Sequence, residues 1–315
     1  MFVVGGESLI DLVSEPRGAD GVIHMHAHQG GSPYNCARAL SKLGNETGFL
    51  CPISKDGFGA YLLEPLTEDG VKPLLEARVT APTTLAVVTL DHAGKAQYEF
   101  YRGADRAFTA EGMIASLPAD LEVFQFGGFA PILPEDAEVW TEVVKAAITK
   151  GATISMDPNV RPSLIDDFEG YKSRLSVFLD LAHLVKVSEE DLAALDATMS
   201  IEAHAEALLE RPNCELVVVT LGENGSRAFT RNGRATAGIY APPVFGDTVG
   251  AGDSLMAGIL TRLSEMGALK PGVLGQLDDE QLAEVLRFGA VVAGLNCAHK
   301  GCVPPRRAEV DAVLG

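Results

Sequence analysis

Residues 246–254 read GDTVGAGDS, and this stretch carries the residues whose chemistry is most specific in the chain. Gly250 and Gly252 have no side chain, so backbone N–H groups can gather around an anion. The apolar run at 255–263 predicts a helix that begins here, and a helix N-terminus attracts negative charge through its unpaired donors and its dipole. The stretch therefore predicts a turn that binds phosphate.

Asp253 brings a carboxylate to the same turn. There it can accept the proton of a hydroxyl group that attacks a bound phosphate, and we expect the helix N-terminus to lower its pKa. A low pKa is compatible with this role, because phosphoryl transfer depends on positioning and charge neutralisation more than on a strong base. Thr248 and Asp253 are also ordinary helix-capping residues, so the turn alone leaves a purely structural interpretation open.

The composition excludes several classes of function. The 315 residues, 47% of them hydrophobic, suffice for a large core, and the net charge of −18 argues against nucleic acid and anionic membrane surfaces as partners. No apolar run approaches the roughly 18 residues of a membrane span, and the N-terminus lacks a basic signal segment, so we expect a cytoplasmic protein. The five cysteines are scattered without a CxxC pair, which favours free thiols over a metal site or disulfides.

Short apolar runs alternate with helix-like segments along most of the chain. Strands are expected at 2–5, 123–126, 153–156, 184–187 and 216–220, and helices at 33–43, 135–149 and 281–298. This alternation predicts an α/β fold with a mostly parallel central sheet flanked by helices. Runs at 83–90 and 96–102, joined by DHAGK, predict a hairpin. We expect segments 12–29 and 83–104 to form a small β-sheet lid on a single domain of residues 1–315.

The sequence DTVGAGD resembles the signature of the ribokinase (PfkB) family of ATP-dependent carbohydrate kinases, whose motif is DTxGAGD. The chain has no P-loop pattern GxxxxGK[ST], and the turn is not a GxGxxG fingerprint. The resemblance implies a ribokinase-like three-layer fold. It also implies that Gly250, Ala251 and Gly252 form an anion hole with Asp253, and that Asp253 is the catalytic base.

Polar side chains follow the ends of two predicted strands. Asp11 comes shortly after the strand at 2–5, and Arg161 lies in DPNVR, which follows the strand at 153–156. In an open α/β sheet, ligands bind beyond the carboxyl ends of the strands. Arg161 can hold a transferring phosphate or an anionic substrate group. Asp11 also fits a turn cap, but GESLIDL is similar to the family pattern GExLxDL, which implies that Asp11 binds sugar hydroxyls.

The sequence GGSPYNC at 30–36 predicts the start of a helix, with Ser32 as the N-cap and proline as the first helical residue. A structural role explains this segment nearly as well as a ligand site does. Its similarity to the family motif GGxxxN implies that Gly30, Gly31 and Asn35 hold the sugar.

The expected lid carries another candidate contact with the substrate. FYR at 100–102 resembles fructokinase-like members of the family, whose arginine reaches the substrate pocket. The resemblance therefore implies a substrate contact for Arg102, with Tyr101 beside it. A charge that faces solvent is the structural alternative for Arg102.

Three histidines alternate in the strand-like segment 22–29. His24, His26 and His28 fall on one face of that strand. Three imidazoles can bind a metal ion, but no carboxylate or cysteine joins them in sequence, so a plain polar face is favoured.

The resemblance also implies residues that bind ATP and ions. TLGENG at 220–225 resembles the family's TLGxxG nucleotide loop, and the implied ATP contacts are Lys186, Ser188, Thr220, Gly222, Gly225, Gly250, Gly252 and Asn296. The family often has NxxE where this chain has Ser188 and Asp191, which leaves an indirect magnesium role for Asp191 open. Asp247 and Val249 are the implied ligands of a monovalent cation such as K⁺.

These ordered motifs predict a kinase that transfers the γ-phosphate of Mg-ATP to a primary sugar hydroxyl. The resemblance to fructokinases makes D-fructose the expected substrate. 2-Keto-3-deoxygluconate is the alternative, with its carboxylate on Arg102, Arg106 or Arg161. A ribose or nucleoside kinase is a less favoured alternative. The lid offers few aromatic side chains for base stacking, which argues against a nucleoside. From another class, a non-catalytic sugar-binding protein remains open. The resemblance implies a homodimer through the lid.

Overall fold

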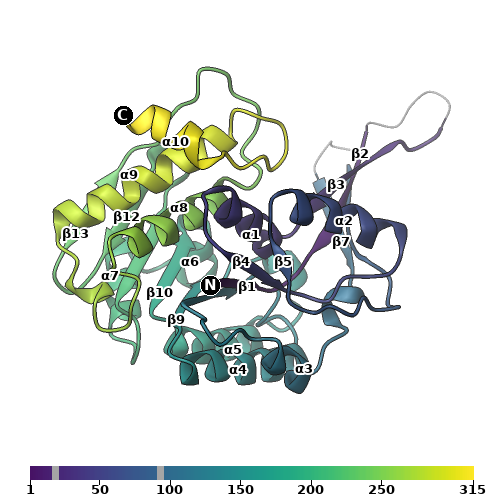
Figure 1. Ribbon diagram of the computed structural model, residues 1–315, viewed down its shortest axis with the longest axis horizontal. Coiled ribbons are helices and arrows are strands. Elements are labelled where there is room, and N and C mark those ends of the chain that lie inside the picture. Colours follow the sequence, from purple (N-terminus) through teal and green to yellow (C-terminus); the bar gives the residue numbers. More distant parts are fainter. Residues whose placement is uncertain (16–20, 91–95) are drawn as a thin grey trace.

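The protein is described by a computed structural model that covers residues 1–15, 21–90 and 96–315 (Figure 1). Its centre is a nine-stranded sheet in the order β13-β12-β11-β10-β9-β8-β1-β4-β5. Neighbouring strands are parallel except at the β11–β12 and β12–β13 pairs. The strands are β1 (Phe2–Gly5), β4 (Thr47–Leu50), β5 (Lys72–Pro73), β8 (Val123–Gly127), β9 (Thr153–Asp157), β10 (Leu184–Ser188), β11 (Leu216–Thr220), β12 (Ser226–Phe229) and β13 (Arg234–Ala237).

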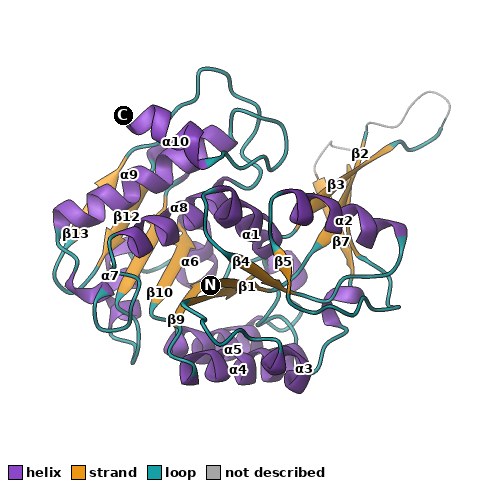
Figure 2. Cartoon of the chain, viewed as in Figure 1, coloured by secondary structure: helices purple, strands orange, loops and turns teal. Residues whose placement is uncertain are grey.

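Helices cover both faces of this sheet, which confirms the predicted three-layer α/β fold (Figure 2). One face packs on α1 (Ser32–Lys42), α2 (Gly57–Glu68), α8 (Ala251–Glu265), α9 (Asp279–Asn296) and α10 (Arg307–Leu314). The other packs on α3 (Ala110–Ala115), α4 (Pro134–Thr149), α5 (Phe168–Leu181), α6 (Glu189–Asp196) and α7 (Ile201–Leu209). The central strands β1, β8 and β9 are buried at every residue, as expected for parallel strands covered on both sides.

Helix α8 is the most deeply placed helix of the first layer. Its residues from Asp253 to Leu263 are all buried except Arg262, which explains the apolar run read in the sequence. The helix lies against α9, where a Cβ on Gly258 would come within 2.8 Å of the Cα of Gly289. This close backbone contact fixes the axis of α8, and with it the position of the glycine-rich turn at its N-terminus.

A second, four-stranded sheet has the order β3-β2-β6-β7 and projects from the three layers (Figure 1). Its strands are β2 (Leu9–Ser14), β3 (Met25–Gly30), β6 (Thr84–Leu90) and β7 (Ala96–Tyr101). The β6–β7 pairing confirms the predicted hairpin, although its DHAGK turn lies outside the described residues. Asp11 comes shortly after the end of β1, as predicted, but it lies within strand β2 rather than in a loop. A short turn at Gly6 leads the chain into β2, where Asp11 stands opposite His28.

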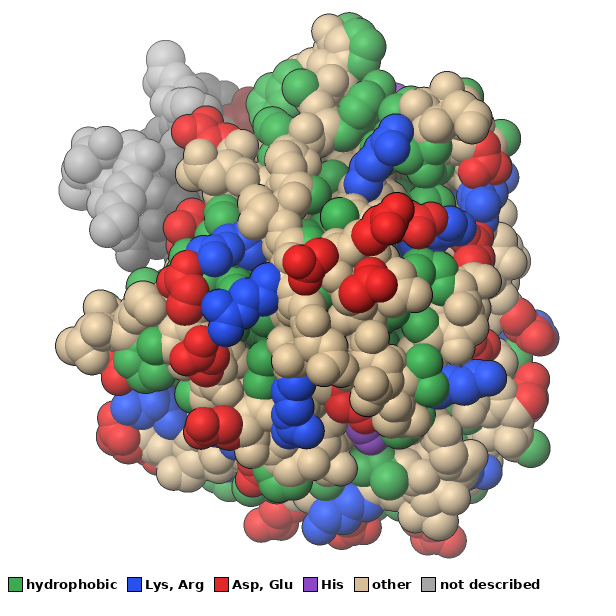
Figure 3. Space-filling view, turned by 90° about the vertical axis from the view of Figure 1, so that its left-hand side faces the viewer, with side chains coloured by type: hydrophobic (Ala, Val, Ile, Leu, Met, Phe, Trp, Pro, Cys, Tyr) green, Lys and Arg blue, Asp and Glu red, His purple; other side chains and the backbone are tan. Residues whose placement is uncertain are grey.

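The surface charges, the length of the helices and the state of the cysteines complete the description of the fold. The face shown in Figure 3 carries lysine and arginine interspersed with acidic side chains, despite the net charge of −18. Within the described ranges, no helix is long and apolar enough to cross a membrane. All five cysteines are free, and Cys302 is the only one of them that is not fully buried.

Candidate active site

Two adjoining cavities open at the carboxyl edge of the parallel strands. The first, which we call the Asp11 cavity, has a volume of about 410 Å³ and is lined by Glu7, Leu9, Asp11, Gly31, Ser32, Phe100, Gly128, Phe129, Asn159, Arg161, Ser163 and Leu164. The second, the Lys186 cavity, has a volume of about 510 Å³ and is lined by Ser32, Asn35, Asp157, Asn159, Arg161, Lys186, Ser188, Glu190, Asp191, Thr220 and residues 248–253. Ser32, Asn159 and Arg161 belong to both, so the cavities meet at these side chains.

Asp253 lies in the first turn of α8 and lines the Lys186 cavity, next to Ser32, which belongs to both cavities. Its carboxylate accepts hydrogen bonds from Ser32 Oγ at 2.6 Å and from Asn35 Nδ2 at 2.9 Å. The pKa of Asp253 is raised by burial to about 6, against the lowering effect of these donors. Our expectation of a lowered pKa was therefore wrong, because desolvation outweighs the favourable end of the helix.

The prediction that Ser32 is the N-cap of helix α1 was also wrong. The N-cap of α1 is Gly31, and no side chain caps this helix. The Ser32 hydroxyl instead crosses to Asp253, a residue 221 positions away in the sequence. A pattern typical of helix capping thus provides a donor that orients the carboxylate.

The turn before α8 leaves backbone donors open toward the Lys186 cavity. Gly250 is the N-cap, with φ of +73°. The Ala251 N–H donates within the turn to the Thr248 carbonyl, whereas those of Gly252 and Asp253 donate no hydrogen bond within the described chain. Of the three residues expected to form the anion hole with Asp253, Ala251 thus has its amide already engaged. The open donors are suited to an anion.

Lys186 projects from β10 beneath this turn. Its Nζ lies 2.5 Å from Asp157 Oδ2, and both side chains are buried. A Cβ on Gly252 would lie 3.3 Å from Nζ, so glycine keeps the lysine close to the backbone donors. Burial acts to lower the pKa of Lys186, but the ion pair with Asp157 outweighs it and holds that pKa above its ordinary value. The lysine therefore carries a fixed positive charge.

Carboxylates at the Lys186 cavity fit a magnesium ion that is bound together with phosphate. Asp157 Oδ1 is buried and has no hydrogen-bond partner in the described chain, and Asp191 and Glu190 line the same cavity. Mg²⁺ prefers such oxygen ligands and is held by one or two carboxylates plus phosphate and water. Among the described residues, no three His, Cys, Asp or Glu side chains form a metal site by themselves. This also applies to the described histidines His24, His26 and His28.

Asp191 already holds the backbone at this cavity. Its Oδ1 accepts the Val160 N–H at 2.7 Å, and its Oδ2 accepts the Ser188 N–H at 2.8 Å. The Ser188 hydroxyl accepts the Asp191 N–H in return, so the two residues form a capping box at the start of α6. Any contact between Asp191 and a metal ion has to use the remaining lone pairs of these oxygens.

Asp11 and the two glycines before α1 shape the other cavity. Asp11 accepts no hydrogen bond from the described chain, and burial raises its pKa to about 6, against the effect of His28. A Cβ on Gly30 would meet Asp11 Oδ2 at 2.2 Å, and one on Gly31 would meet the Glu7 carbonyl at 2.7 Å. Glycine at position 31 thus avoids a clash with backbone, and glycine at position 30 leaves room for the Asp11 carboxylate.

Among the residues that line this cavity, Glu7, Phe100 and Phe129 were not predicted as site residues from the sequence. Glu7 is buried, accepts the Phe129 N–H at 3.1 Å, and has a pKa that burial raises to about 7. Phe129 and Phe100 form an apolar wall, with ring centroids 5.5 Å apart. Glu7 stands in the GESLIDL motif, which was a usable signal. No pattern in the sequence marks Phe129, because it is brought to the cavity by the end of β8.

Two lid residues expected at the substrate lie elsewhere. Arg102 does not line the Asp11 cavity, because its guanidinium group is paired with Asp105 at 2.6 Å and with Asp136 at 3.0 Å. Tyr101 is 58% exposed and donates to Glu99 instead. The alternation of side chains along β7 places Phe100 on the cavity face and Tyr101 on the opposite face.

Asn296, a predicted ATP contact, does not line the Lys186 cavity. Asn296 has no exposed surface, because its Nδ2 donates to the Val249 carbonyl at 2.7 Å and its Oδ1 accepts the Val303 N–H at 2.9 Å. The Asp247 carboxylate accepts the N–H groups of Val249 and Gly301 at 2.9 and 2.8 Å. The Asp247 side chain and the Val249 carbonyl, named as ligands of a monovalent cation, thus already hold this loop together.

One residue at the end of strand β11 lines the Lys186 cavity. Thr220 lines the Lys186 cavity, whereas Gly222 and Gly225 are not part of its lining. Both glycines have positive φ, and a Cβ on Gly225 would meet the Ala237 carbonyl at 2.1 Å. They shape the turn that follows Thr220.

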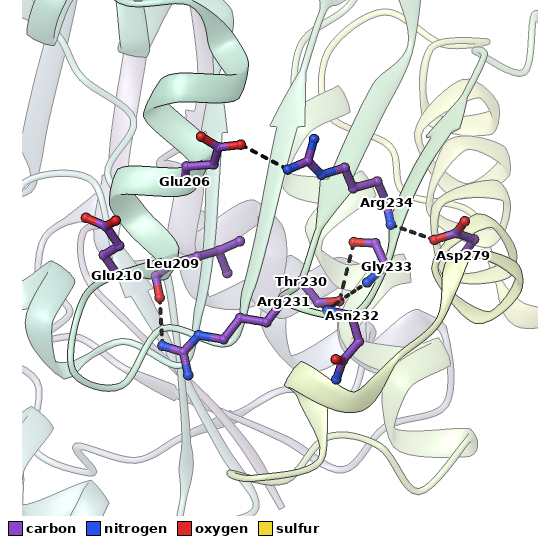
Figure 4. A pocket seen from close by; sticks show the side chains of 9 residues that line it. All are labelled: Glu206, Leu209, Glu210, Thr230, Arg231, Asn232, Gly233, Arg234 and Asp279. Carbon is purple, nitrogen blue, oxygen red and sulfur yellow. Dashed lines mark hydrogen bonds and ion pairs between the residues drawn. The ribbon is translucent and has the colours of Figure 1, made fainter.

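A third cavity, of about 650 Å³, lies away from Asp253 (Figure 4). It surrounds the β12–β13 turn, and the antiparallel pairing of β12 with β11 places it at the opposite edge of the sheet. Its charges are engaged: Arg234 pairs with Glu206 at 2.9 Å, and Arg231 donates to the Leu209 carbonyl. This surface offers no set of open donors comparable to the turn before α8.

Comparison with known proteins agrees with the chemistry of the two adjoining cavities. Residues 1–308 match the sequence profile described as pfkB family carbohydrate kinase. The chain belongs to this family of carbohydrate kinases. It is 32% identical to fructokinase-2 of Solanum lycopersicum, over 100% of this chain and 96% of that protein. It is 31% identical to probable fructokinase-4 of Arabidopsis thaliana, with the same coverage of both chains.

Solved structures of fructokinases are similar to this kinase in fold. The crystal structure of fructokinase with bound ATP from Xylella fastidiosa has a TM-score of 0.87 and 29% identity, over 99% of this chain and 97% of that one. The fructokinase of Vibrio cholerae O395, in a form with fructose, ADP and calcium ion bound, has a TM-score of 0.81 and 25% identity, over 100% and 98%. The kinase therefore has the ribokinase-like fold that the motifs predicted.

Proposed function

We propose that this kinase transfers the γ-phosphate of Mg-ATP to a primary hydroxyl of D-fructose. The observation that carries the proposal is that Asp253, which lines the Lys186 cavity, accepts a hydrogen bond from Ser32, which lines both cavities. A sugar in the Asp11 cavity would present its hydroxyl to Asp253. The phosphates of ATP would occupy the Lys186 cavity, beside the open N–H groups at the start of α8.

The reaction follows from the charges at this junction. Asp253 accepts the proton of the sugar hydroxyl while the hydroxyl oxygen forms a bond to the γ-phosphorus of ATP. The bond between that phosphorus and the oxygen that leaves with ADP breaks. The N–H groups of Gly252 and Asp253, together with Lys186 and Arg161, neutralise charge on the phosphoryl oxygens. Mg²⁺ would be held by Asp157, with Asp191 and Glu190 at the same cavity, and would neutralise negative charge on the phosphates of ATP. Ser32 and Asn35 orient the carboxylate throughout.

The charges around the Asp11 cavity favour a neutral sugar. Arg102 and Arg106, two of the three arginines considered for a carboxylate, are both paired with Asp136. Glu7 and Asp11 add acidic groups to the cavity, and these can accept hydrogen bonds from hydroxyls. Arg161 is the one observation that supports 2-keto-3-deoxygluconate as an alternative substrate, because its guanidinium group lines this cavity.

The substrate is tested by measuring ADP release from Mg-ATP with D-fructose, ribose, 2-keto-3-deoxygluconate or a nucleoside, in the presence of K⁺. We expect turnover on fructose to exceed that on the other acceptors. Preference for the keto-deoxy acid would contradict the choice of fructose and assign Arg161 to its carboxylate. No turnover on any acceptor would contradict the proposed reaction.

The role of Asp253 is tested in the same assay by Asp253→Asn. This variant keeps the size of the side chain but cannot accept the proton, so kcat should fall by at least roughly 10²–10⁴-fold. Glu223→Gln removes an exposed carboxylate that lines neither cavity and measures the general effect of losing a negative charge. Activity of the Asp253→Asn variant within a factor of two of the parent would exclude Asp253 as the base.

We also propose that the chain is a single kinase domain whose second sheet acts as a lid over the Asp11 cavity. Leu9, Asp11 and Phe100 of that sheet already line the cavity. K⁺ dependence and a cytoplasmic location, where ATP is present, complete the proposal. Omitting K⁺ from the assay tests the first of these.

A further inference from the structure

Phe129 is held from two sides, by Glu7 and by Arg102. It forms part of the wall of the Asp11 cavity and is 7% exposed. Its N–H donates to Glu7 at 3.1 Å, and the guanidinium carbon of Arg102 lies 4.7 Å from the centre of its ring. A cation over an aromatic ring is attracted by the ring's negative face, most strongly where water is excluded.

Arg102 is itself fixed by a buried cluster of charges. Asp105 accepts two hydrogen bonds from its guanidinium group, at 2.9 and 2.6 Å, and Asp136 lies 3.0 Å from Nη1. The exposed fractions of the Arg102, Asp105 and Asp136 side chains are 15%, 0% and 4%. A planar guanidinium group bound in this way has little freedom to leave the ring of Phe129.

The same cluster fastens the second sheet to the three-layer body. Asp105 accepts hydrogen bonds from Thr84 Oγ1, at the start of β6, and from the Gly103 N–H, just after β7. Asp136 belongs to the first turn of α4. Arg102 thus connects the base of the second sheet, helix α4 and the ring of Phe129.

We propose that Arg102 is a positioning residue for the sugar site, which acts by holding Phe129 in the wall of the Asp11 cavity rather than by binding the substrate. The inference rests on the proposed function in placing the sugar in that cavity. The effect passes from the charge cluster to the ring of Phe129, and from there to Phe100, whose ring meets it edge-on at 83°. Sugar affinity is then set by side chains that never contact the sugar's reacting hydroxyl.

The test is a double-mutant cycle of Arg102→Met and Phe129→Leu, read as kcat and KM for sugar and for ATP. Each single variant should raise KM for the sugar roughly 2- to 30-fold, the range expected for losing a partly desolvated contact of this kind. kcat and the KM for ATP should stay within about twofold, because the Lys186 cavity is untouched. The double variant should be no worse than the more affected single variant.

Arg106→Met is the matched control. Arg106 also pairs with Asp136, at 3.0 Å, but its side chain is 33% exposed and is not stacked on Phe129. Its KM for the sugar should stay within about twofold of the parent's. Arg102→Lys, which keeps the charge but not the planar group, should fall between the parent and Arg102→Met, and it replaces the methionine variant if that one does not fold.

Hydrogen exchange of the segment 126–132, measured without ligand, separates this inference from the proposed function. Exchange should rise in Arg102→Met and not in Arg106→Met. If no sugar is turned over by the parent but exchange rises as expected, the proposed function is wrong and the support of Phe129 by Arg102 stands. Unchanged exchange, independent effects that multiply in the double variant, or an equal loss of ATP affinity would overturn the inference.

Discussion

At the scale of single residues, the chemistry depends on the protonation of Asp253. The carboxylate is buried, and its pKa is about 6 rather than the ordinary 3.8. Burial raises the pKa of an acid because the charged form loses hydration. A base with a pKa somewhat below neutral is ionised at pH 7 and can still take up the proton of a hydroxyl group.

We therefore predict that kcat/KM for ATP, at saturating sugar, rises with pH through about 6 and is level above about 7. The sign follows from the role of the group: below its pKa the acid is protonated and cannot accept the hydroxyl proton. Initial rates between pH 5 and 8.5 measure this limb. Asp11→Asn serves as a control, because Asp11 also has a pKa of about 6 but lies in the other cavity. A limb that disappears in Asp11→Asn, or a flat profile in the parent, would contradict the assignment.

At the scale of elements, the glycine turn and helix α8 act as one unit. Gly250 has φ of +73°, and a Cβ there would lie 2.3 Å from Cys302 Sγ. The helix start is thus fixed by the left-handed turn on one side and by the loop at 296–303 on the other. Asn296 and Asp247, which were expected to bind nucleotide and cation, hold these two segments together.

We predict that Gly250→Ala lowers kcat roughly 10²-fold, comparable to losing a donor from an oxyanion site. The matched control is Gly267→Ala, just beyond the other end of α8, where φ is +69° and a Cβ would meet nothing within 4 Å. Both substitutions strain the left-handed backbone by about 1–2 kcal/mol. Gly250→Ala adds the clash with Cys302 Sγ, so its thermal unfolding should shift more than that of Gly267→Ala. Only Gly250→Ala should lose activity, and equal losses in the two variants would show that strain alone is responsible.

At the scale of the whole molecule, the second sheet is the part that packs least against the rest. Its outer strands β3 and β7 form its two edges, and it exposes the apolar side chains of Val13, Met25 and Tyr101. Exposed strand edges and apolar side chains are features that a partner chain can cover. We propose a homodimer formed through this sheet.

Light scattering coupled to gel filtration should then give twice the chain mass of 33.2 kDa. Met25→Lys places a charge on the second sheet and should shift the protein toward the monomer. Val177→Lys, at a similarly exposed valine on α5, should leave the dimer intact. A parent that elutes only as a monomer at working concentrations would contradict the proposed dimer.

The sequence by itself determined the features that depend on local chain chemistry. Alternating apolar runs predicted the parallel strands, because burial on both faces requires continuous apolar side chains. The glycines at 250 and 252 predicted a turn suited to an anion, because residues without side chains leave the backbone N–H groups accessible. The order of the motifs along the chain was sufficient to predict the family.

The tertiary structure decided which groups meet across long distances in the chain. Ser32 was read as a helix cap, yet it lies against Asp253 because α1 and α8 pack side by side. Arg102 was expected at the substrate, but Asp105 and Asp136 hold it beneath Phe129. The pKa of Asp253 could not be predicted for the same reason: hydration is lost through packing from all sides, and no stretch of sequence around one residue records that packing.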